Sequence, residues 1–394
     1  MRRRLGAATI FVGLLLLNGC TTTSLPLPVD NPPLPPDIAP SQVPAPVAAP
    51  LRSDQERRVL IARLIAPTVR DREAWAGDLH AAFSRLGIPH APEIYCAAIA
   101  VIEQESNFQA DPVVPGLPAI AWKGLEERGK KYGIPKLLIK TAMLKTSPDG
   151  RSYRQRIDAL KTEKQLNALY ADMIAEVPAG KQLLGGYNPV RTGGPMQVSI
   201  EFAEQFARTR PYPYPHKGDI RDEVFSRRGG LYFGSAILLD YPAPYDNVLY
   251  RFADFNAGRY SSRNAAFQSA LGRLAGKPLS LDGDLLRYDR GQATAAPSGV
   301  ELAARSLAGK LQMRPAEIRR DLLLEKAAQF SHSPLFNRVF KLAEQQAGRP
   351  LPRQAMPQID LKSPKITRQL TTEWFARRVD GRYRTCLGRI EASL

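Results

Sequence analysis

Cysteine and histidine are scarce in this 394-residue chain, which contains three of the first and four of the second. No two cysteines are close enough to form a Cys-x-x-Cys pair. The histidines are too widely spaced to suggest a shared metal site, so we predict that the protein binds no metal ion. The four are His80, His90, His216 and His332.

Long apolar runs are also missing beyond the N-terminus, where a 13-residue apolar stretch covers residues 5–17. A helix needs roughly 20 such residues to cross a bilayer. Arg2, Arg3 and Arg4 precede this stretch, and Leu17-Asn18-Gly19-Cys20 ends it. Positive charge, a short apolar segment and a small residue before a cysteine are typical of the export signal of a bacterial lipoprotein. We predict a signal peptide over residues 1–19 and lipidation of Cys20. An ordinary cleaved signal and an uncleaved anchor are the alternatives, and both would still export the chain.

The segment after Cys20 predicts a tether. Several acyl chains on this cysteine would hold the protein on a membrane. Thr21 stands where inner-membrane lipoproteins usually carry Asp, which indicates the periplasmic face of the outer membrane. Residues 20–52 form the expected lipid-anchored linker, with ten prolines between positions 21 and 50. Such a segment favours polyproline II and spans roughly 90 Å at about 3.1 Å per residue.

Acidic residues are outnumbered by basic ones, 38 to 55, which gives a formal net charge of +17. A basic surface favours acidic partners. Outside the cytoplasm these are the carboxylates of peptidoglycan and anionic lipid, so we predict peptidoglycan as the partner, membrane contact through the N-terminal lipid, and no nucleic acid. The basic residues are also scattered, so ordinary solvated charge is the alternative for any single cluster. No partner protein in wall remodelling can be named from the residues.

Two cysteines remain once Cys20 is lipidated. An even pair in an oxidising compartment predicts a disulfide between Cys96 and Cys386. Closing so long a loop would add roughly 5 kcal/mol at most to the free energy of unfolding. Two buried thiols are the alternative.

Apolar residues recur at helical spacing through most of the chain, and no run alternates as strands do, so we predict an all-α protein. Breaks rich in glycine or proline separate the helices. The expected helices are 59–64, 75–86, 94–108, 160–174, 200–206, 225–239, 265–274, 300–311 and 335–342, with amphipathic patterns also over 298–311, 315–329 and 335–346 and a last helix ending near Cys386.

The helix expected over residues 94–108 carries two carboxylates. At about 100° per residue, Glu105 shares a face with the apolar residues, whereas Glu103 lies about 160° away, beside Cys96. A carboxyl group on a buried face is costly unless paired or protonated, and apolar surroundings raise its pKa. That property suits a general acid at neutral pH. The alternative is a Glu at the margin of the stripe that pairs with an arginine.

Three segments in order carry a resemblance. They are the Glu105-Ser106 pair, the turn Gly193-Gly194-Pro195-Met196-Gln197-Val198-Ser199, and Asp254-Phe255-Asn256-Ala257-Gly258, with a glycine-bearing helix over 228–234 between the last two. Over about residues 91–275 they resemble the soluble-type lytic transglycosylases of the lysozyme-like superfamily, and a group of bacterial lipoproteins that carry such a domain. The resemblance implies a lysozyme-like catalytic domain over 53–290 with a helical insertion over about 110–185, and a helical C-terminal extension over 291–394.

The resemblance also implies an activity without metal or cofactor. Glu105 would be the sole acid/base: it would protonate the glycosidic oxygen leaving a muramic acid residue, and then accept the proton of that sugar's 6-hydroxyl as a 1,6-anhydro ring closes. A tethered nucleophile replaces the second carboxylate of a hydrolase. The residues implied in supporting the acid, lining the glycan groove or packing beside it are Ser106, Met196, Gln197, Phe255 and Asn256.

Some residues depart from the family pattern. Phe255 replaces the usual tyrosine, so Tyr232, Tyr250 or Tyr260 would have to supply the missing hydroxyl. The insertion is expected to cover or extend the groove. A non-catalytic peptidoglycan-binding or scaffold lipoprotein is therefore the main alternative, and the C-terminal extension is expected to be structural. A true hydrolase would need a second carboxylate. Its candidate suppliers are Asp111, Asp219, Asp222, Glu223 and Asp254.

Overall fold

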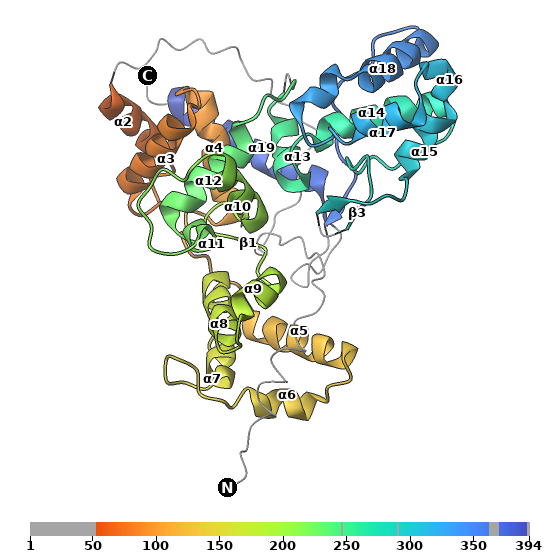
Figure 1. Cartoon of the computed structure of the whole chain (residues 1–394). Coiled ribbons are helices and arrows are strands. Elements are labelled where there is room, and N and C mark those ends of the chain that lie inside the picture. The colour runs from red at the N-terminus through yellow and green to blue at the C-terminus, as the bar shows by residue number, and fades with distance from the viewer. Residues whose placement is uncertain (1–52, 246, 290, 362–369, 392–394) are drawn as a thin grey trace. The chain divides into compact units, whose positions relative to one another are not determined.

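The computed structural model describes residues 53–245, 247–289, 291–361 and 370–391 (Figure 1). In these residues the chain is mostly helical, and its strands are three antiparallel pairs of two residues each. The all-α prediction is confirmed at this level. The expected signal peptide, Cys20 and the proline-rich linker lie outside the described residues. Within the described ranges, no helix is both long enough and apolar enough to cross a membrane.

The chain divides into two compact units. Unit 1 contains residues 105–233, and unit 2 contains the described parts of 53–104, 234–361 and 370–391. The division falls inside two helices, α4 (Pro92–Glu105) and α12 (Arg227–Leu239). The described residues of 247–289 and 291–361 belong to the same unit, so the boundary between the units does not fall where the C-terminal extension was expected to begin.

Unit 1 begins at Glu105 and contains residues 110–185, the segment expected as an insertion. This segment is helical, as expected. Ser152 and Thr162 start two of its helices with capping boxes, in which each side chain accepts from the third backbone N–H and a glutamine reaches back. A hydrophobic core of eight buried residues, from Val114 to Met173 in the sequence, holds the helices of this segment together. The elements are α5 (Leu117–Lys131), α6 (Lys136–Ala142), α7 (Tyr153–Asp158), α8 (Glu163–Ala175), α9 (Gly180–Leu184), η1 (Gly185–Tyr187), β1 (Thr192–Gly193), β2 (Val198–Ser199), α10 (Ile200–Thr209) and α11 (Ile220–Val224).

Unit 2 combines the N-terminal helices with the C-terminal half of the chain. Helix α19 (Thr372–Glu391) packs on α13 (Leu249–Ala257) and on α2 (Asp54–Leu64), while α14 (Ser261–Ala275) packs on α18 (Pro334–Ala347). A second hydrophobic core runs from Ala266 to Ala343. The remaining elements are α3 (Arg72–Leu86), β3 (Tyr288–Asp289), β4 (Gln292–Ala293), α15 (Gly299–Ser306), α16 (Ala308–Leu311), α17 (Pro315–Leu322), η2 (Ala328–His332), β5 (Asp360–Leu361) and β6 (Leu370–Thr371).

A buried arginine links two parts of unit 2. Arg263, at the start of α14, is fully buried and donates to the backbone oxygens of Glu325 and Ala327 and to the side chain of Asn264. Its guanidinium lies 4.2 Å from the ring centroid of Tyr260. Burial lowers the pKa of Arg263 to about 10, so the group still carries its charge at neutral pH. These bonds satisfy a cation that would otherwise be costly to bury.

Several predicted helix bounds are wrong. The helix expected over 94–108 ends at Glu105, because Asn107 and Phe108 adopt left-handed backbone angles that no helix can contain. The helix expected over 315–329 ends at Leu322, and the residues after it supply the oxygens that bind Arg263. The helix expected over 300–311 is divided into α15 and α16, and the last helix continues beyond Cys386 to Glu391.

Candidate functional site

Glu105 occupies the last position of α4 and is only 5% exposed. The chain leaves the helix immediately afterwards, through Asn107 and Phe108 with φ of 49° and 60°. Ser106 and Phe108 are buried as well. The predicted burial of Glu105 is therefore confirmed, and the abrupt turn places this carboxyl group at a helix end rather than within a helix.

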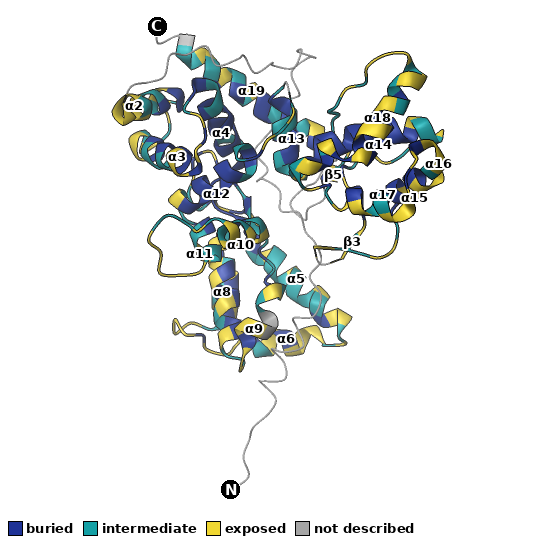
Figure 2. Cartoon of the chain, turned by 45° about the horizontal axis from the view of Figure 1, so that its top comes forward, coloured by how far each residue is buried: buried dark blue, intermediate teal, exposed yellow. Residues whose placement is uncertain are grey.

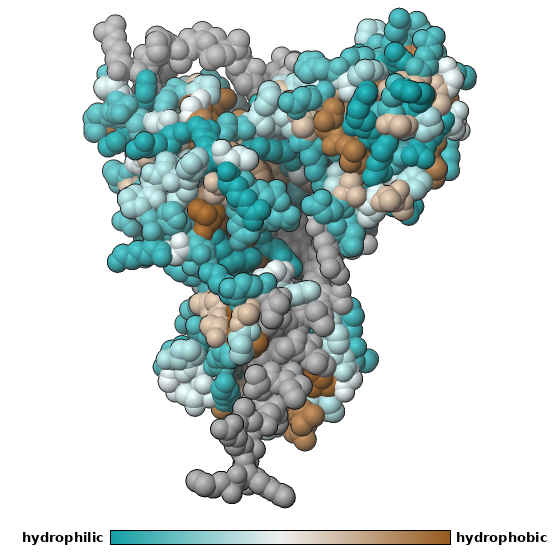
Figure 3. Space-filling model, viewed as in Figure 1, coloured by the Kyte–Doolittle hydropathy of each residue, from teal (hydrophilic) through white to brown (hydrophobic). Residues whose placement is uncertain are grey.

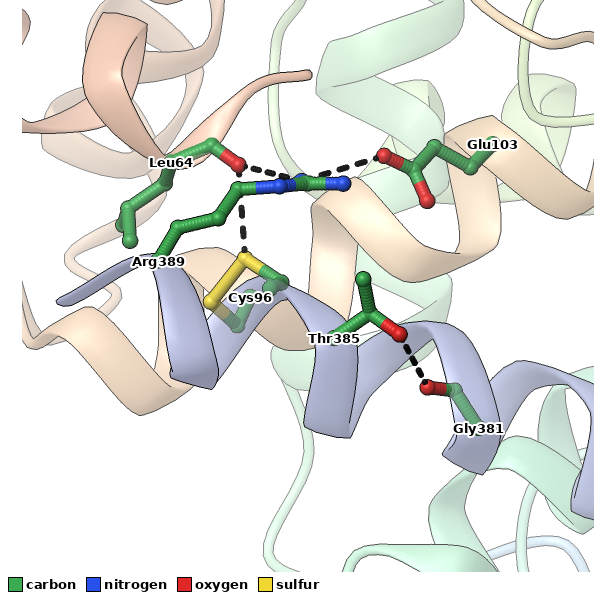
Figure 4. The surroundings of a disulfide bond; sticks show 7 residues. Leu64, Cys96, Glu103, Gly381, Thr385 and Arg389 are labelled. Atoms are coloured by element: carbon green, nitrogen blue, oxygen red, sulfur yellow. Dashed lines mark hydrogen bonds and ion pairs between the residues drawn. A yellow bond between two sulfur atoms is a disulfide. The ribbon is translucent and has the colours of Figure 1, made fainter. Parts of the chain in front are cut away.

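Helix α4 is buried on all its faces from Tyr95 to Ile102, and Figure 2 shows it as a continuously buried element. The sequence pattern predicted a single apolar stripe. The difference arises because α19, nearly 300 residues away in the sequence, covers the side of α4 that carries Cys96. These two helices are joined there by a disulfide between Cys96 and Cys386, with the Cα atoms 5.5 Å apart, as predicted (Figure 4).

Glu103, the other carboxylate of α4, belongs to this disulfide-bearing side. Arg389 of α19 donates to Glu103 at 3.3 Å and to the backbone oxygen of Leu64 at 2.6 Å (Figure 4). The Glu103 side chain is 12% exposed. Glu103 is thus an ion-pair partner that holds α19 against α4.

The glycine-rich turn forms a small hairpin in unit 1. Strands β1 and β2 pair Thr192 with Ser199, and Gly194 has φ of 73°. A Cβ added to Gly193 would lie 2.2 Å from a ring carbon of Phe225, and one added to Gly194 would lie 2.0 Å from the backbone oxygen of Val224. Both positions therefore require glycine. This close approach holds the hairpin against the segment that joins α11 to α12.

Helix α12, which lies between the second and third motifs in the sequence, also packs closely against the glycine-rich turn. A Cβ on Gly230 of α12 would lie 2.4 Å from Pro195 Cδ. The absence of a side chain at Gly230 thus makes room for the turn. Met196 is fully buried beneath it.

Gln197 adopts left-handed backbone angles, with φ of 47°. Its side-chain oxygen accepts from the Thr192 hydroxyl at 3.1 Å, and its side-chain nitrogen contacts the backbone oxygen of Gly194 at 3.5 Å. The side chain is half-buried. The hairpin thus fixes the orientation of the amide that was predicted to contact the glycan.

The third motif lies on α13 in unit 2, where Asp254 organises the surrounding backbone. Its carboxylate accepts from the hydroxyls of Tyr241 and Tyr245 at 3.1 and 2.6 Å, and from the backbone N–H groups of Tyr260 and Ser262 at 2.8 and 2.7 Å. Asp254 is fully buried, and burial raises its pKa. These donors engage both of its oxygens, which weakens the case for Asp254 as a second carboxylate that holds a water molecule.

Phe255 and Asn256 are half-buried on the same helix. Asn256 Oδ1 accepts from the hydroxyl of Thr372, the first residue of α19, at 2.9 Å. Two of the tyrosines considered as replacements for the missing hydroxyl, Tyr232 and Tyr260, are buried. Asn256 thus contacts the C-terminal helix, a partner that sequence reasoning did not predict.

The other candidate second carboxylates are engaged within unit 1. Asp111 accepts from Thr162 at 2.9 Å. Asp219 pairs with Lys181 at 2.9 Å, and Asp222 accepts from Asn167 at 3.4 Å. Glu223 accepts from Tyr212 at 2.9 Å. Each has a structural partner, which weakens the case for a two-carboxylate hydrolase.

Residues other than glycine that have positive φ are concentrated at the three motifs. Among the described residues, seven that are not glycine have positive φ, and four of them lie in a motif or within two residues of one: Asn107, Phe108, Gln197 and Tyr260. Each such residue costs about 1 to 2 kcal/mol. Strain of this kind persists where the surroundings enforce it, commonly at functional sites. Asparagine visits the left-handed region more readily than most residues, but Phe108, Gln197 and Tyr260 are of types that rarely do, so the sequence carries no sign of the strain at these three positions.

Two of the histidines, which the sequence spaces widely, lie together in unit 2. The ring centroids of His80 and His90 are 5.0 Å apart, and His90 Nδ1 lies 2.6 Å from the Tyr95 hydroxyl. In the described ranges, no group of three or more His, Cys, Asp or Glu residues is arranged to hold a metal ion. The pair lies next to α4, which carries Tyr95.

Protonation of this pair is expected to destabilise the protein. Burial lowers the pKa of His80 and of His90, although Asp54, 3.3 Å from His80, partly opposes the shift, and Arg57 adds to it. Below about pH 6.5 the unfolded chain binds more protons than the folded chain, so the free energy of unfolding falls as the pH drops, by about 1.4 kcal/mol per unit of pKa shift. Urea unfolding between about pH 7.5 and 5.5 measures this change. The His80→Gln, His90→Gln variant should show a shallower pH dependence, and an unchanged one would contradict the prediction.

Comparisons with known proteins cover most of the chain. A family model described as "Protein of unknown function (DUF1615)" matches residues 68–389. The "Uncharacterized protein YaiW" of Escherichia coli (strain K12) is 52% identical over 320 residues, which are 81% of this chain and 86% of that protein. No solved structure matches the chain. The family match includes all three motifs and both cysteines of the disulfide.

Proposed function

Since the chain belongs to the DUF1615 family, whose description states no activity, we propose a function from its own residues: it is a lytic transglycosylase that cleaves peptidoglycan between N-acetylmuramic acid and N-acetylglucosamine. The observation that carries this proposal is the burial of Glu105, the carboxylate of the first motif, at the end of α4. Glu103, on the same helix, pairs with Arg389. We therefore assign the proton transfer to Glu105.

In the proposed mechanism Glu105 is protonated before the reaction. In general, burial disfavours a charged carboxylate, and the C-terminal end of a helix carries partial negative charge that acts in the same direction. A protonated Glu105 can donate to the glycosidic oxygen. The resulting carboxylate can then accept the proton of the muramic acid 6-hydroxyl as it attacks the anomeric carbon and closes the 1,6-anhydro ring. Because this nucleophile belongs to the reacting sugar, the step needs neither a second carboxylate nor a positioned water.

The motif geometry supports a glycan site in unit 1. The hairpin at Gly193 and Gly194 is fixed by close packing, and it holds the Gln197 amide through Thr192. A pre-oriented amide on a rigid turn is suited to hydrogen bonding with a sugar. Ser106, buried directly after the acid, is proposed to support it.

The proposed location is the periplasmic face of the outer membrane, with the chain anchored through lipid on Cys20. The N-terminal sequence carries this part of the proposal. The net charge of +17 supports it, because the peptide stems of peptidoglycan carry carboxylates. The proline-rich linker would let the folded units reach the wall from the membrane.

Digestion of purified sacculi tests the activity. The mature chain with Cys20→Ser is expected to release muropeptides that end in 1,6-anhydro-N-acetylmuramic acid. Mass spectrometry identifies them, because each is one water molecule lighter than the product of hydrolysis. Products of full hydrolytic mass would instead indicate a lysozyme-type hydrolase.

A non-catalytic peptidoglycan-binding scaffold is the second candidate. The observation that favours it is Phe255, which lacks the hydroxyl that lytic transglycosylases usually have at this position. A protein that sediments with sacculi but releases no soluble product would support this candidate over the enzyme.

A further inference from the structure

Helix α6 in unit 1 presents leucines to solvent. Leu137 is 74% exposed and Leu138 53%, and Leu144, just after the helix, is 55% exposed. Of the seven large hydrophobic residues that are exposed in the described chain, these three fall within eight positions. Figure 3 shows hydrophobic surface where α6 lies. We name these three residues the leucine ridge.

The ridge is held outward by the packing beneath it. Ile139, between the exposed leucines and the end of α6, is fully buried, and Met143 belongs to the core of unit 1. A Cβ on Gly129 of α5 would lie 2.3 Å from Ile139 Cδ1, so α5 and α6 approach closely through this glycine. Rotating α6 to bury the leucines would expose Ile139 and Met143. The ridge is thus a preformed surface.

The segment that carries the ridge is rich in positive charge. Residues 128–145 include six basic residues and no acidic one. Lys136 and Lys145 pair with Glu126 and Glu176, at 2.8 and 2.5 Å. The other exposed lysines of the segment are Lys130, Lys131 and Lys140.

We propose that the leucine ridge docks on an anionic lipid bilayer. The leucines would enter the boundary between headgroups and acyl chains, and the lysines would extend their apolar stems along it while their ammonium groups meet lipid phosphates. Leucines with a rim of lysine are the composition of helices that lie in a membrane interface. The ridge thereby gives unit 1 a membrane contact that is separate from any N-terminal lipid.

The same composition disfavours a protein partner. Lysine is depleted in protein–protein interfaces relative to the rest of the surface, and leucine is under-represented among the residues that dominate binding energy. A bilayer requires no matching pocket, which suits a short convex ridge. This proposal does not depend on the transglycosylase activity, because none of its residues belongs to the three motifs.

Vesicle flotation tests the proposal. The mature chain carrying Cys20→Ser, which removes any acyl anchor, is mixed with vesicles of phosphatidylglycerol and phosphatidylethanolamine in equal parts, or of phosphatidylcholine alone. We expect binding to the anionic vesicles and much weaker binding to the neutral ones. Leu137→Ser with Leu138→Ser should weaken binding at least about tenfold, because the apolar contact is lost. Lys130→Glu with Lys131→Glu and Lys140→Glu should weaken it by at least as much.

The chain offers a matched control. Leu302 and Leu323 of unit 2 are exposed to a similar degree, at 53% and 52%, but lie outside the basic segment. Leu302→Ser with Leu323→Ser should bind vesicles as the parent does. Exposed substitutions change stability little, and thermal melting of each variant verifies this. Absence of vesicle binding by the parent, or equal binding by the parent and the Leu137→Ser, Leu138→Ser variant, would overturn the proposal and leave a protein partner as the explanation of the ridge.

Discussion

Glu105→Gln is expected to abolish the release of anhydro-muropeptides while leaving binding to sacculi intact. Glutamine has nearly the shape of glutamic acid but has no acidic proton to donate and no carboxylate to accept one. If proton transfer is the main role of Glu105, the rate should fall at least about 10² to 10⁴-fold. Chromatography with mass spectrometry measures the products, and sedimentation with sacculi measures binding.

Glu103→Gln is the matched control on the same helix. It removes one charge from the pair with Arg389, which should cost some stability because Arg389 loses its ionised partner. Turnover measured below the melting temperature should stay close to that of the parent. A fully active Glu105→Gln variant would refute the assignment. Loss of activity in Glu103→Gln alone would mean that the roles of the two carboxylates are reversed.

Removal of the disulfide, through Cys96→Ala with Cys386→Ala, is expected to cause the largest loss of stability. The bond joins α4 to α19 and spans 290 positions of sequence. In the chain-entropy description, a cross-link over such a length contributes about 5 kcal/mol by restricting the unfolded chain, and measured values are often lower. Denaturant unfolding of the parent and the variant gives the difference.

Reductant provides the control for this prediction. Dithiothreitol should lower the unfolding midpoint of the parent but leave the double alanine variant unchanged. Peptide mapping without reductant should recover Cys96 and Cys386 in one linked species. Free thiols at both positions would contradict the bond, and an unchanged midpoint in reductant would contradict its contribution to stability.

The helices could be predicted because their signals are local. Helices α3 and α18 end where Gly87 and Gly348 adopt positive φ, at 71° and 66°, and glycine is the residue that usually ends a helix in this way. The end of α4 could not be predicted similarly. Asn107 and Phe108 have no intrinsic preference for the left-handed region strong enough to reveal it, so the surrounding structure imposes this turn.

The candidate site was predicted in part. Glu105 is buried, and the glycines of the turn are required by packing. The role of Asp254 was not predicted, since its four donors come from both sides of it in the sequence and converge only through the bend after α13. The local sequence around a carboxylate that accepts four hydrogen bonds does not differ from that around a carboxylate exposed to water.

The amino-acid sequence by itself determined the helical class and the difference between the two carboxylates of α4, because helical periodicity acts over one or two turns of chain. It also determined the pairing of the two cysteines, which follows from their number. Tertiary structure alone decided what those carboxylates meet. Arg389 reaches Glu103 across 286 positions of sequence, and α19 buries a face that the pattern left open. The His80–His90 pair and the outward leucines of α6 have the same origin. Contacts between distant segments depend on how all the helices pack together, and no local pattern encodes that arrangement.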